Sequence, residues 1–288
     1  MSKVHAGTDI TFHILTDESV TKQQQTLIQS VITDEHHHVR FYPMSRKQYE
    51  KDERWKGGFT LPPAAYYRLS LAEVLPKDID RVLYLDGDIA INGRLDELFS
   101  LDLNDAPLMA SLSFPPNIKK HTARLKYDKK FGYFNSGVLL INLKWWREHN
   151  AITMYEQTML EHADLIVLHD QDVLNIAFAQ QKAWLPVRYN AQPWLFSELE
   201  ASTLAELKLM ENDIENSRSN PIVIHYCGRA KPWHTDCDHP FRDVFIQSMS
   251  ETPWRDMKMH KSWKDGSFSD KFYHIVGSLK KALRLRQV

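Results

Sequence analysis

Short apolar runs alternate with longer stretches of mixed polarity along most of the chain. The apolar runs predict strands at Ile10–Leu15, Val39–Tyr42, Val82–Leu85, Leu108–Leu112 and Val138–Asn142. The segments between them predict helices over Ser19–Ile32, over Ala64–Leu75 and from Trp145 onward, with a short helical turn at Leu95–Phe99. Strands that alternate with helices in this way are typical of an α/β fold.

Composition narrows the class of protein without naming a function. The chain has 288 residues, of which 43% are hydrophobic, and a net charge of −1, which gives no case for nucleic-acid binding. It has only two cysteines, so a reducing, cytoplasmic setting is expected rather than a disulfide framework. No apolar run is long enough to span a bilayer, and the start lacks the features of a signal peptide. We expect a cytoplasmic protein, or one attached to a membrane surface.

Two carboxylates follow the apolar run at Val82–Leu85, which reads as a strand buried on both faces of a mostly parallel sheet. Asp86 and Asp88, separated by Gly87, would then lie at the carboxyl end of this strand, where α/β sheets bind ligands. Two hard oxygen donors at this spacing can bind one divalent cation, which an enzyme acting on a sugar nucleotide needs for the diphosphate. Taken alone, the motif favours a simple Asp-Gly turn.

Three later segments carry further candidate chemistry. Asn135 opens a polar turn with a glycine before the strand at Val138–Asn142, and such a turn allows a ligand close to the backbone. Asp170 can be read as a helix N-cap, with Gln171 projecting from the first helical turn toward a ligand.

The third segment ends a strand at His225, with Gly228 and Lys231 beyond it. Imidazole for a metal, and a backbone amide and an ammonium for phosphate, fit a cation and phosphate site that suits Mn²⁺.

Two other segments receive less specific interpretations. The three histidines at 36–38 cannot all face one ion from a regular element, so a solvated turn is favoured over a metal site. The polar, basic segment Pro115–Lys130 is predicted to be a loop that could lie over a cleft.

Four segments in this order resemble the motifs of the family 8 retaining glycosyltransferases: YLDGD, YFNSGVLLINL, DQDVLN and HYCGRAKPWH. Within that family the chain is most similar to bacterial lipopolysaccharide core and lipooligosaccharide glucosyl- and galactosyltransferases. The resemblance extends from about Ile10 to Trp254. It implies a GT-A type fold, which is a Rossmann-like mixed sheet flanked by helices.

The resemblance also implies roles for individual residues. Asp86, Asp88 and His225 would bind Mn²⁺ or Mg²⁺ against the two phosphates of a UDP-sugar. The remaining matched positions would contact the donor: Arg68 reaching toward it, Asn135 at its sugar, Gly87 beside the metal carboxylates, Gly228 and Lys231 at the diphosphate, and Asp170 with Gln171 on the reactive face of the sugar.

The chain departs from the family at two places, its start and a segment near its middle. The family's first strand, with its uridine-binding turn, and the helix after it are expected to be missing, because the start resembles the family's second strand. Near the middle, Ser113 stands close to an acidic position of some relatives, which leaves the acceptor open. We divide the chain into a glycosyltransferase domain at 1–254 and a tail at 255–288. From Asp270 onward the tail has helical apolar spacing and basic residues, which suits either a membrane surface or the protein's own core.

The expected function is retaining transfer of glucose or galactose from a UDP-sugar to a lipopolysaccharide core sugar. Because the family's residue below the sugar is an amide, here Gln171, we expect same-face substitution through an oxocarbenium-like transition state rather than double displacement. Two alternatives stay open. One is a self-glucosylating enzyme of the glycogenin kind, and the other is an inactive sugar-nucleotide-binding protein truncated at its start.

Overall fold

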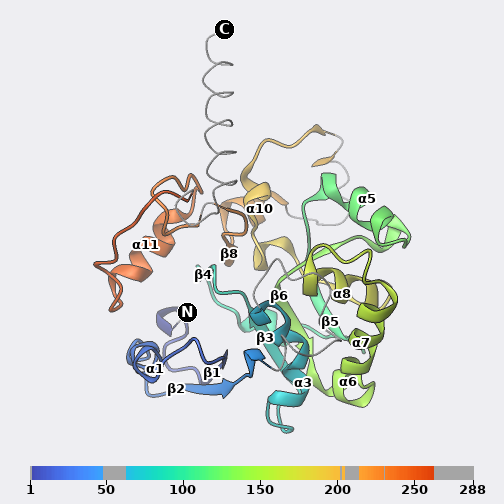
Figure 1. Ribbon diagram of the computed structural model, residues 1–288. Helices are drawn as coiled ribbons and strands as arrows, with labels where there is room; N and C mark the ends of the chain where they lie inside the picture. Colours follow the sequence, from blue (N-terminus) through green and yellow to red (C-terminus); the bar gives the residue numbers. More distant parts are fainter. Residues whose placement is uncertain (1, 48–62, 202, 205–213, 230, 263–288) are drawn as a thin grey trace, which may run out of the picture.

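A four-stranded mixed sheet forms the centre of the computed structural model, which describes residues 2–47, 63–201, 203–204, 214–229 and 231–262 (Figure 1). Its strand order is β3-β6-β5-β7, with bounds Arg81–Leu85, Phe134–Asn142, Leu108–Leu112 and Ala183–Trp184. β6 is antiparallel to both neighbours, whereas β5 and β7 are parallel. Two strand pairs lie beside this sheet: β1 (Ile10–Thr16) parallel to β2 (His37–Pro43), and β4 (Ile89–Ile91) antiparallel to β8 (Val223–His225).

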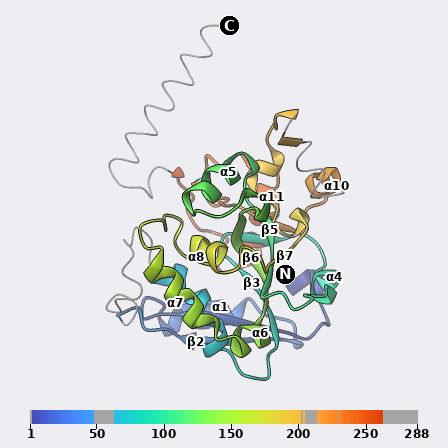
Figure 2. The same ribbon diagram turned by 90° about the vertical axis from the view of Figure 1, so that its right-hand side faces the viewer.

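Helices complete the layers around the sheet. The α-helices are α1 (Lys22–Ser30), α3 (Leu71–Val74), α4 (Asp96–Ser100), α5 (Pro115–Arg124), α6 (Leu143–Glu148), α7 (Ala151–Glu161), α8 (His169–Ala177), α10 (Ile214–Ser219) and α11 (Arg242–Ser250). The 3₁₀ segments are η1 (Ser2–His5), η3 (Pro63–Ser70), η4 (Lys129–Phe131), η5 (Val187–Tyr189) and η6 (Pro193–Phe196). In two perpendicular views, α6, α7 and α8 lie together on one side of the sheet (Figures 1 and 2).

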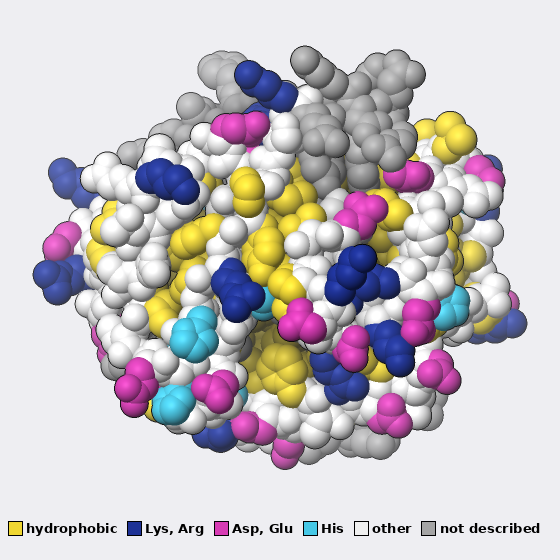
Figure 3. Space-filling view, turned by 90° about the horizontal axis from the view of Figure 1, so that it is seen from below, with side chains coloured by type: hydrophobic (Ala, Val, Ile, Leu, Met, Phe, Trp, Pro, Cys, Tyr) yellow, Lys and Arg dark blue, Asp and Glu magenta, His cyan; other side chains and the backbone are white. Residues whose placement is uncertain are grey.

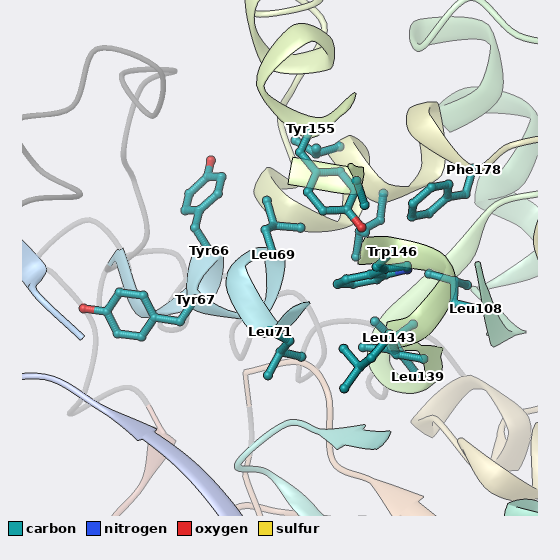
Figure 4. Close-up of a cluster of buried hydrophobic side chains, with 14 of the residues drawn as sticks. Tyr66, Tyr67, Leu69, Leu71, Leu108, Leu139, Leu143, Trp146, Tyr155 and Phe178 are labelled. Atoms are coloured by element: carbon teal, nitrogen blue, oxygen red, sulfur yellow. The ribbon is translucent and has the colours of Figure 1, made fainter. Parts of the chain in front are cut away.

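Strand β6 organises the core because its apolar side chains alternate between two faces. Leu139 and Ile141 belong to the cluster that holds Trp146 of α6, Tyr155 of α7 and Phe178 at the end of α8 (Figure 4). The alternate β6 residues belong to a second cluster, formed with α4, η5 and β8: Val138 and Leu140. All four β6 side chains are fully buried, so the strand is fixed from both sides.

The structure corrects the interpretation of the Val82–Leu85 run. β3 pairs with β6 alone, in antiparallel orientation, and all four of these residues are only partly buried. The run is apolar throughout because the two faces of β3 pack into different clusters. Val82 and Tyr84 belong to one cluster, and Leu83 and Leu85 belong to the other. The strand is therefore an edge of the four-stranded sheet, not a central parallel strand.

Two predicted loops or turns are regular structure. The segment predicted as a loop at Pro115–Lys130 contains helix α5 and the short η4, and α5 begins with proline at its first positions, where the missing N–H costs nothing. The predicted polar turn from Asn135 to Gly137 is part of β6, which starts at Phe134. A register shift in β5 between Ala110 and Leu112 lies opposite this part of β6.

Three further findings concern the cysteines, the surface charge and membrane-spanning helices. Cys227 and Cys237 are both free thiols. Acidic and basic side chains are interspersed with apolar ones on the face seen from below in Figure 1, so no single-sign field covers that face (Figure 3). No helix among the described residues has the length and apolar character to cross a membrane. The basic part of the tail lies outside the described residues, and the missing first strand stays a prediction.

Candidate functional site

Strand pairing brings the candidate residues together from distant parts of the sequence. Asp86 follows β3, and its backbone N–H donates to the carbonyl oxygen of Gly137 on β6 at 2.9 Å. The chain then continues through Asp88 into β4, where Ile89 pairs with His225 of β8. The register of two separate strand pairs thus places two carboxylates and an imidazole at one point.

Asp86, Asp88 and His225 form a candidate divalent-cation site. One ligand atom from each residue lies within 4.8 Å of the others. Nε2 of His225 is 3.3 Å from Oδ1 of Asp88 and 3.8 Å from Oδ2 of Asp86, and the His225 side chain is 2% exposed. Two carboxylates and one imidazole suit Mn²⁺ and also allow Mg²⁺. This donor set therefore fits the metal that the sequence implied.

Arg68 joins the cation site to the start of α8. Its Nη2 donates to Oδ1 of Asp86 at 2.9 Å, and its Nε lies 3.1 Å from Oδ2 of Asp170. Nη1 donates to the carbonyl oxygen of Ser136 at 2.7 Å, and the guanidinium lies over the ring of Tyr84 at 4.3 Å. Arg68 is thus the buried counter-ion of two carboxylates, and its predicted contact with the donor stays a prediction.

Burial and charge shift the pKa of Asp170 in opposite directions. Burial is the larger effect and raises its pKa to about 6, although Arg68 favours the ionised form. The side chain is not a helix cap: α8 begins at His169, and Asp170 lies in the first turn, where its Oδ2 accepts from the Ser136 hydroxyl at 3.0 Å. The N-cap interpretation was wrong because α8 begins one residue before Asp170, whose carboxyl instead accepts from Ser136 of β6.

Gln171 projects from the first turn of α8, as predicted, and its amide is held in one orientation. Oε1 accepts from the backbone N–H of Ser136 at 3.0 Å and from Nδ2 of Asn135 at 3.2 Å. Nε2 donates to the hydroxyl of Tyr133 at 3.0 Å. The predicted donor-sugar residues Asn135 and Gln171 therefore contact each other directly.

Asp172 was missed by the sequence interpretation, although it lies within the DQD motif. It is fully buried and accepts hydrogen bonds from Arg124, from Tyr133 and from the backbone N–H groups of Val167 and Leu168. Burial works to raise its pKa, but these donors outweigh burial and hold the pKa below its usual value. Arg124 belongs to α5. The segment predicted to be a loop over a cleft is therefore a helix, and it supplies the counter-ion of Asp172.

Lys231 and Gly228 lie beyond β8. The Lys231 ammonium pairs with Oδ2 of Asp88, and its Nζ also donates to the carbonyl oxygen of Tyr226 at 3.1 Å. Burial alone would raise the pKa of Asp88, but His225 and Lys231 reverse the shift and lower it well below the usual range. Gly228 is exposed and has φ of +106°, a conformation that requires glycine.

Gly137 is a second residue that sequence reasoning did not assign to the site. A Cβ atom at this position would lie 2.2 Å from Cε1 of His225 and 2.8 Å from Oδ2 of Asp86. Gly87, which was assigned, has nothing within 4 Å of an added Cβ. The close approach of β6 to the metal ligands therefore depends on Gly137.

The histidines at 36–38 do not form a second candidate site. In the part of the chain that the structure describes, the cluster at Asp86 is the one group of three or more potential metal ligands. His37 is buried within β2, whereas His36 is exposed in the turn before it. His37 and His38 belong to β2, so only part of the segment is the predicted solvated turn.

The sequence matches the family model for glycosyl transferase family 8 over residues 2–237. The chain belongs to this family. Its predicted membership is therefore confirmed, and the match covers all the candidate site residues.

Curated relatives of the family 8 chain include three bacterial proteins. General stress protein A of Bacillus subtilis is 33% identical over 66% of the chain and 66% of its own length. A lipopolysaccharide 1,2-glucosyltransferase of Escherichia coli is 28% identical over 92% of the chain and 76% of its own length. A lipopolysaccharide 1,3-galactosyltransferase of Salmonella typhimurium is 32% identical over 66% of the chain, and the match spans 55% of that enzyme.

Solved structures confirm the predicted fold. The galactosyltransferase LgtC, in complex with donor and acceptor sugar analogues, superposes with a TM-score of 0.71 at 26% identity, over 92% of this chain and 91% of LgtC. An active-site mutant of LgtC, in which glutamate replaces a glutamine, gives a TM-score of 0.73 at 25% identity, over 91% of each chain. The family 8 chain therefore has the GT-A type fold of LgtC.

We expect Gly137→Ala to weaken divalent-cation binding more than Gly87→Ala does. The added methyl group at residue 137 must displace the buried His225 ring or the Asp86 carboxylate, whereas at residue 87 it enters open space. Loss of one ligand's alignment corresponds to a change of about 10-fold or more in Mn²⁺ affinity. Calorimetric titration of both purified variants with Mn²⁺ measures the effect. Equal affinities would show that this close approach does not position the ligands.

The raised pKa of Asp170 makes a prediction for stability. A carboxyl with a folded-state pKa of about 6 and an ordinary value of 3.8 stabilises the fold fully only below pH 3.8, and this contribution is lost as pH rises through 6. Relative to Asp170→Asn, the metal-free wild type should lose about 3 kcal/mol of unfolding free energy between acidic and neutral pH. Urea denaturation at a series of pH values measures the difference. A wild-type advantage that grows with pH would mean that the Arg68 ion pair outweighs burial.

Proposed function

We propose that this protein is a metal-dependent retaining hexosyltransferase that moves glucose or galactose from a UDP-sugar to a sugar of the lipopolysaccharide core. The observation that carries the proposal is the convergence of Asp86, Asp88 and His225 beside the Asn135–Gln171 pair, in a family 8 chain with the fold of LgtC. The relatives that act on lipopolysaccharide and use glucose or galactose support the choice of acceptor and sugar.

The donor's diphosphate would bind at the cation site. Mn²⁺ or Mg²⁺ held by Asp86, Asp88 and His225 would supply positive charge for the leaving UDP. Lys231 already places its ammonium at Asp88, so it is the cation best located to share phosphate charge there. The exposed backbone at Gly228 lies on the same connection and is our candidate for a phosphate contact through its N–H.

The side chains near the proposed sugar position favour same-face substitution. Double displacement requires a carboxylate that is free to attack the anomeric carbon. Asp170 is buried against Arg68 and Ser136, and Asp172 is fully buried with donors on both oxygens. The amide of Gln171 is a poor nucleophile, but its carbonyl dipole can stabilise positive charge on the sugar. The active-site glutamine of LgtC supports placing this amide at the reaction centre.

The acceptor is a lipid-linked sugar in this proposal, so we place the enzyme in the cytoplasm at the inner surface of the cytoplasmic membrane. The supporting feature is the tail, in which Phe272, Ile275 and Leu279 recur at helical spacing among lysines and arginines. Apolar residues on one face and basic residues on the other bind anionic bilayers.

We expect Asp86→Asn to reduce sugar transfer at least about 1,000-fold, because it removes a ligand charge from the proposed metal site. Gln171→Ala should leave measurable turnover, since same-face substitution does not require a covalent bond to this residue. Release of UDP from UDP-glucose and UDP-galactose with a core oligosaccharide acceptor measures both. Asp96→Asn is the matched control, because Asp96 is half exposed and pairs with Arg94 away from the site.

Three results would contradict parts of this proposal. A glycosyl adduct trapped in Gln171→Glu, with no turnover in Gln171→Ala, would favour double displacement. Sugar found on one of the protein's own tyrosines by mass spectrometry would favour the self-glucosylating alternative. UDP-sugar binding without turnover in the full-length wild type would identify an inactive binding protein.

Removal of residues 270–288 should weaken sedimentation with vesicles that contain anionic phospholipid, and should leave binding to neutral vesicles unchanged. The reason is the loss of five basic side chains, each worth about 1 kcal/mol near an anionic surface: Lys271, Lys280, Lys281, Arg284 and Arg286. Wild-type-like binding by the truncated protein would exclude the membrane role of the tail.

A further inference from the structure

Asn190 contacts the metal-ligand histidine on the side away from the carboxylates. Its Oδ1 lies 2.9 Å from Nδ1 of His225, and the Asn190 side chain is fully buried. It follows η5, and the segment it begins is hydrogen-bonded to β8 through the N–H of His225 and the carbonyl oxygen of Ala191. No sequence motif identified Asn190, and the roles proposed above do not include it.

A backbone N–H determines the direction of the hydrogen bonds around Asn190. The N–H of Gly137 can only donate, so the atom of Asn135 that it meets at 3.0 Å is the amide oxygen. Asn190 approaches the same oxygen at 2.9 Å and must therefore present its NH₂ group there. The other end of the Asn190 amide is then its carbonyl oxygen, and it needs a donor from the imidazole of His225.

A second backbone N–H gives the same orientation independently. Ser136 N–H donates to Gln171, which identifies that atom as Oε1. Asn135 contacts the same oxygen at 3.2 Å and must turn its NH₂ group toward it. This leaves the Asn135 oxygen for Gly137 and Asn190, in agreement with the first assignment.

We propose that Asn190 is a positioning residue that holds neutral His225 in the Nδ1–H tautomer. The lone pair of Nε2 then faces Asp86 and Asp88 and is available to a divalent cation. The proposal concerns the protein's own hydrogen bonds. Only the binding of a divalent cation to this lone pair rests on the proposed function.

The competing tautomer would place a proton on Nε2, which lies 3.3 Å from Oδ1 of Asp88. That arrangement would set the Nδ1 lone pair against the carbonyl oxygen of Asn190, and the repulsion would be strong because both side chains are buried. Asp88 does not depend on this proton alone, because the Lys231 ammonium also donates to its other oxygen. Nδ1 also lies closer to its acceptor on Asn190, at 2.9 Å, than Nε2 lies to Oδ1 of Asp88, at 3.3 Å, so the shorter bond of fixed direction selects the Nδ1–H tautomer.

The test is ¹⁵N–¹H NMR of the histidine-labelled, metal-free protein, at a pH where the nitrogen shifts show the His225 ring to be neutral. The His225 signals are identified by their loss in His225→Gln. We expect a protonated Nδ1 in the wild type and a shift toward protonated Nε2 in Asn190→Leu. Asn175→Leu is the matched control, because Asn175 is equally buried but bonds to the backbone of Phe134 and Gln171. It should keep the wild-type tautomer.

Metal affinity gives a second readout. Asn190→Leu should raise the Mn²⁺ dissociation constant by about 10- to 100-fold, the usual effect of losing a hydrogen-bond partner behind a histidine ligand. The tautomer of the wild type tests the proposal even if Asn190→Leu does not fold.

A protonated Nε2 in the neutral wild-type ring, or an unchanged tautomer in a folded Asn190→Leu protein, would overturn the proposal. A wild type with the Nδ1–H tautomer that binds no Mn²⁺ would support the positioning role and contradict the proposed function.

Discussion

The rest of the site depends on the ion pairs that the buried guanidinium of Arg68 makes with two carboxylates. The guanidinium lies between Asp86, which follows β3, and Asp170, in the first turn of α8, and it also bonds to the backbone of β6 at Ser136. Removing one partner of a buried ion pair costs about 3–5 kcal/mol, because it leaves a charge without compensation. Here one cation compensates two carboxylates. Arg68 thereby fixes the position of the cation site relative to the first turn of α8, which carries Gln171.

The second constraint is the path of β6 through the site. Three consecutive residues of this strand contact four other site residues: Asn135 bonds to Gln171 and Asn190, Ser136 bonds to Asp170, and Gly137 leaves space for His225. The strand can serve them without moving, because its continuation at Val138–Ile141 is fully buried on both faces. A rigid strand is thus the reference for groups contributed by loops and by a helix terminus.

Sequence reasoning identified this site in part, for physical reasons that differ between residues. Asp86, Asp88 and His225 carry chemically distinctive side chains next to short apolar strands, and the resemblance of their ordered motifs to family 8 grouped them. Asn190 and Arg124 have no such local signal, because their roles arise only when η5 and α5 pack against the motif segments. The interpretation of Val82–Leu85 was wrong because a continuous apolar run does not distinguish an edge strand between two clusters from a central parallel strand.

The central claim is that Asp86, Asp88 and His225 bind the divalent cation that a UDP-sugar requires. Anomalous diffraction from crystals grown with Mn²⁺ and UDP tests this most directly. The account predicts a single strong manganese peak in contact with both carboxylates and Nε2 of His225, next to the UDP phosphates. UDP bound elsewhere, or bound here with no manganese peak between these three side chains, would contradict it.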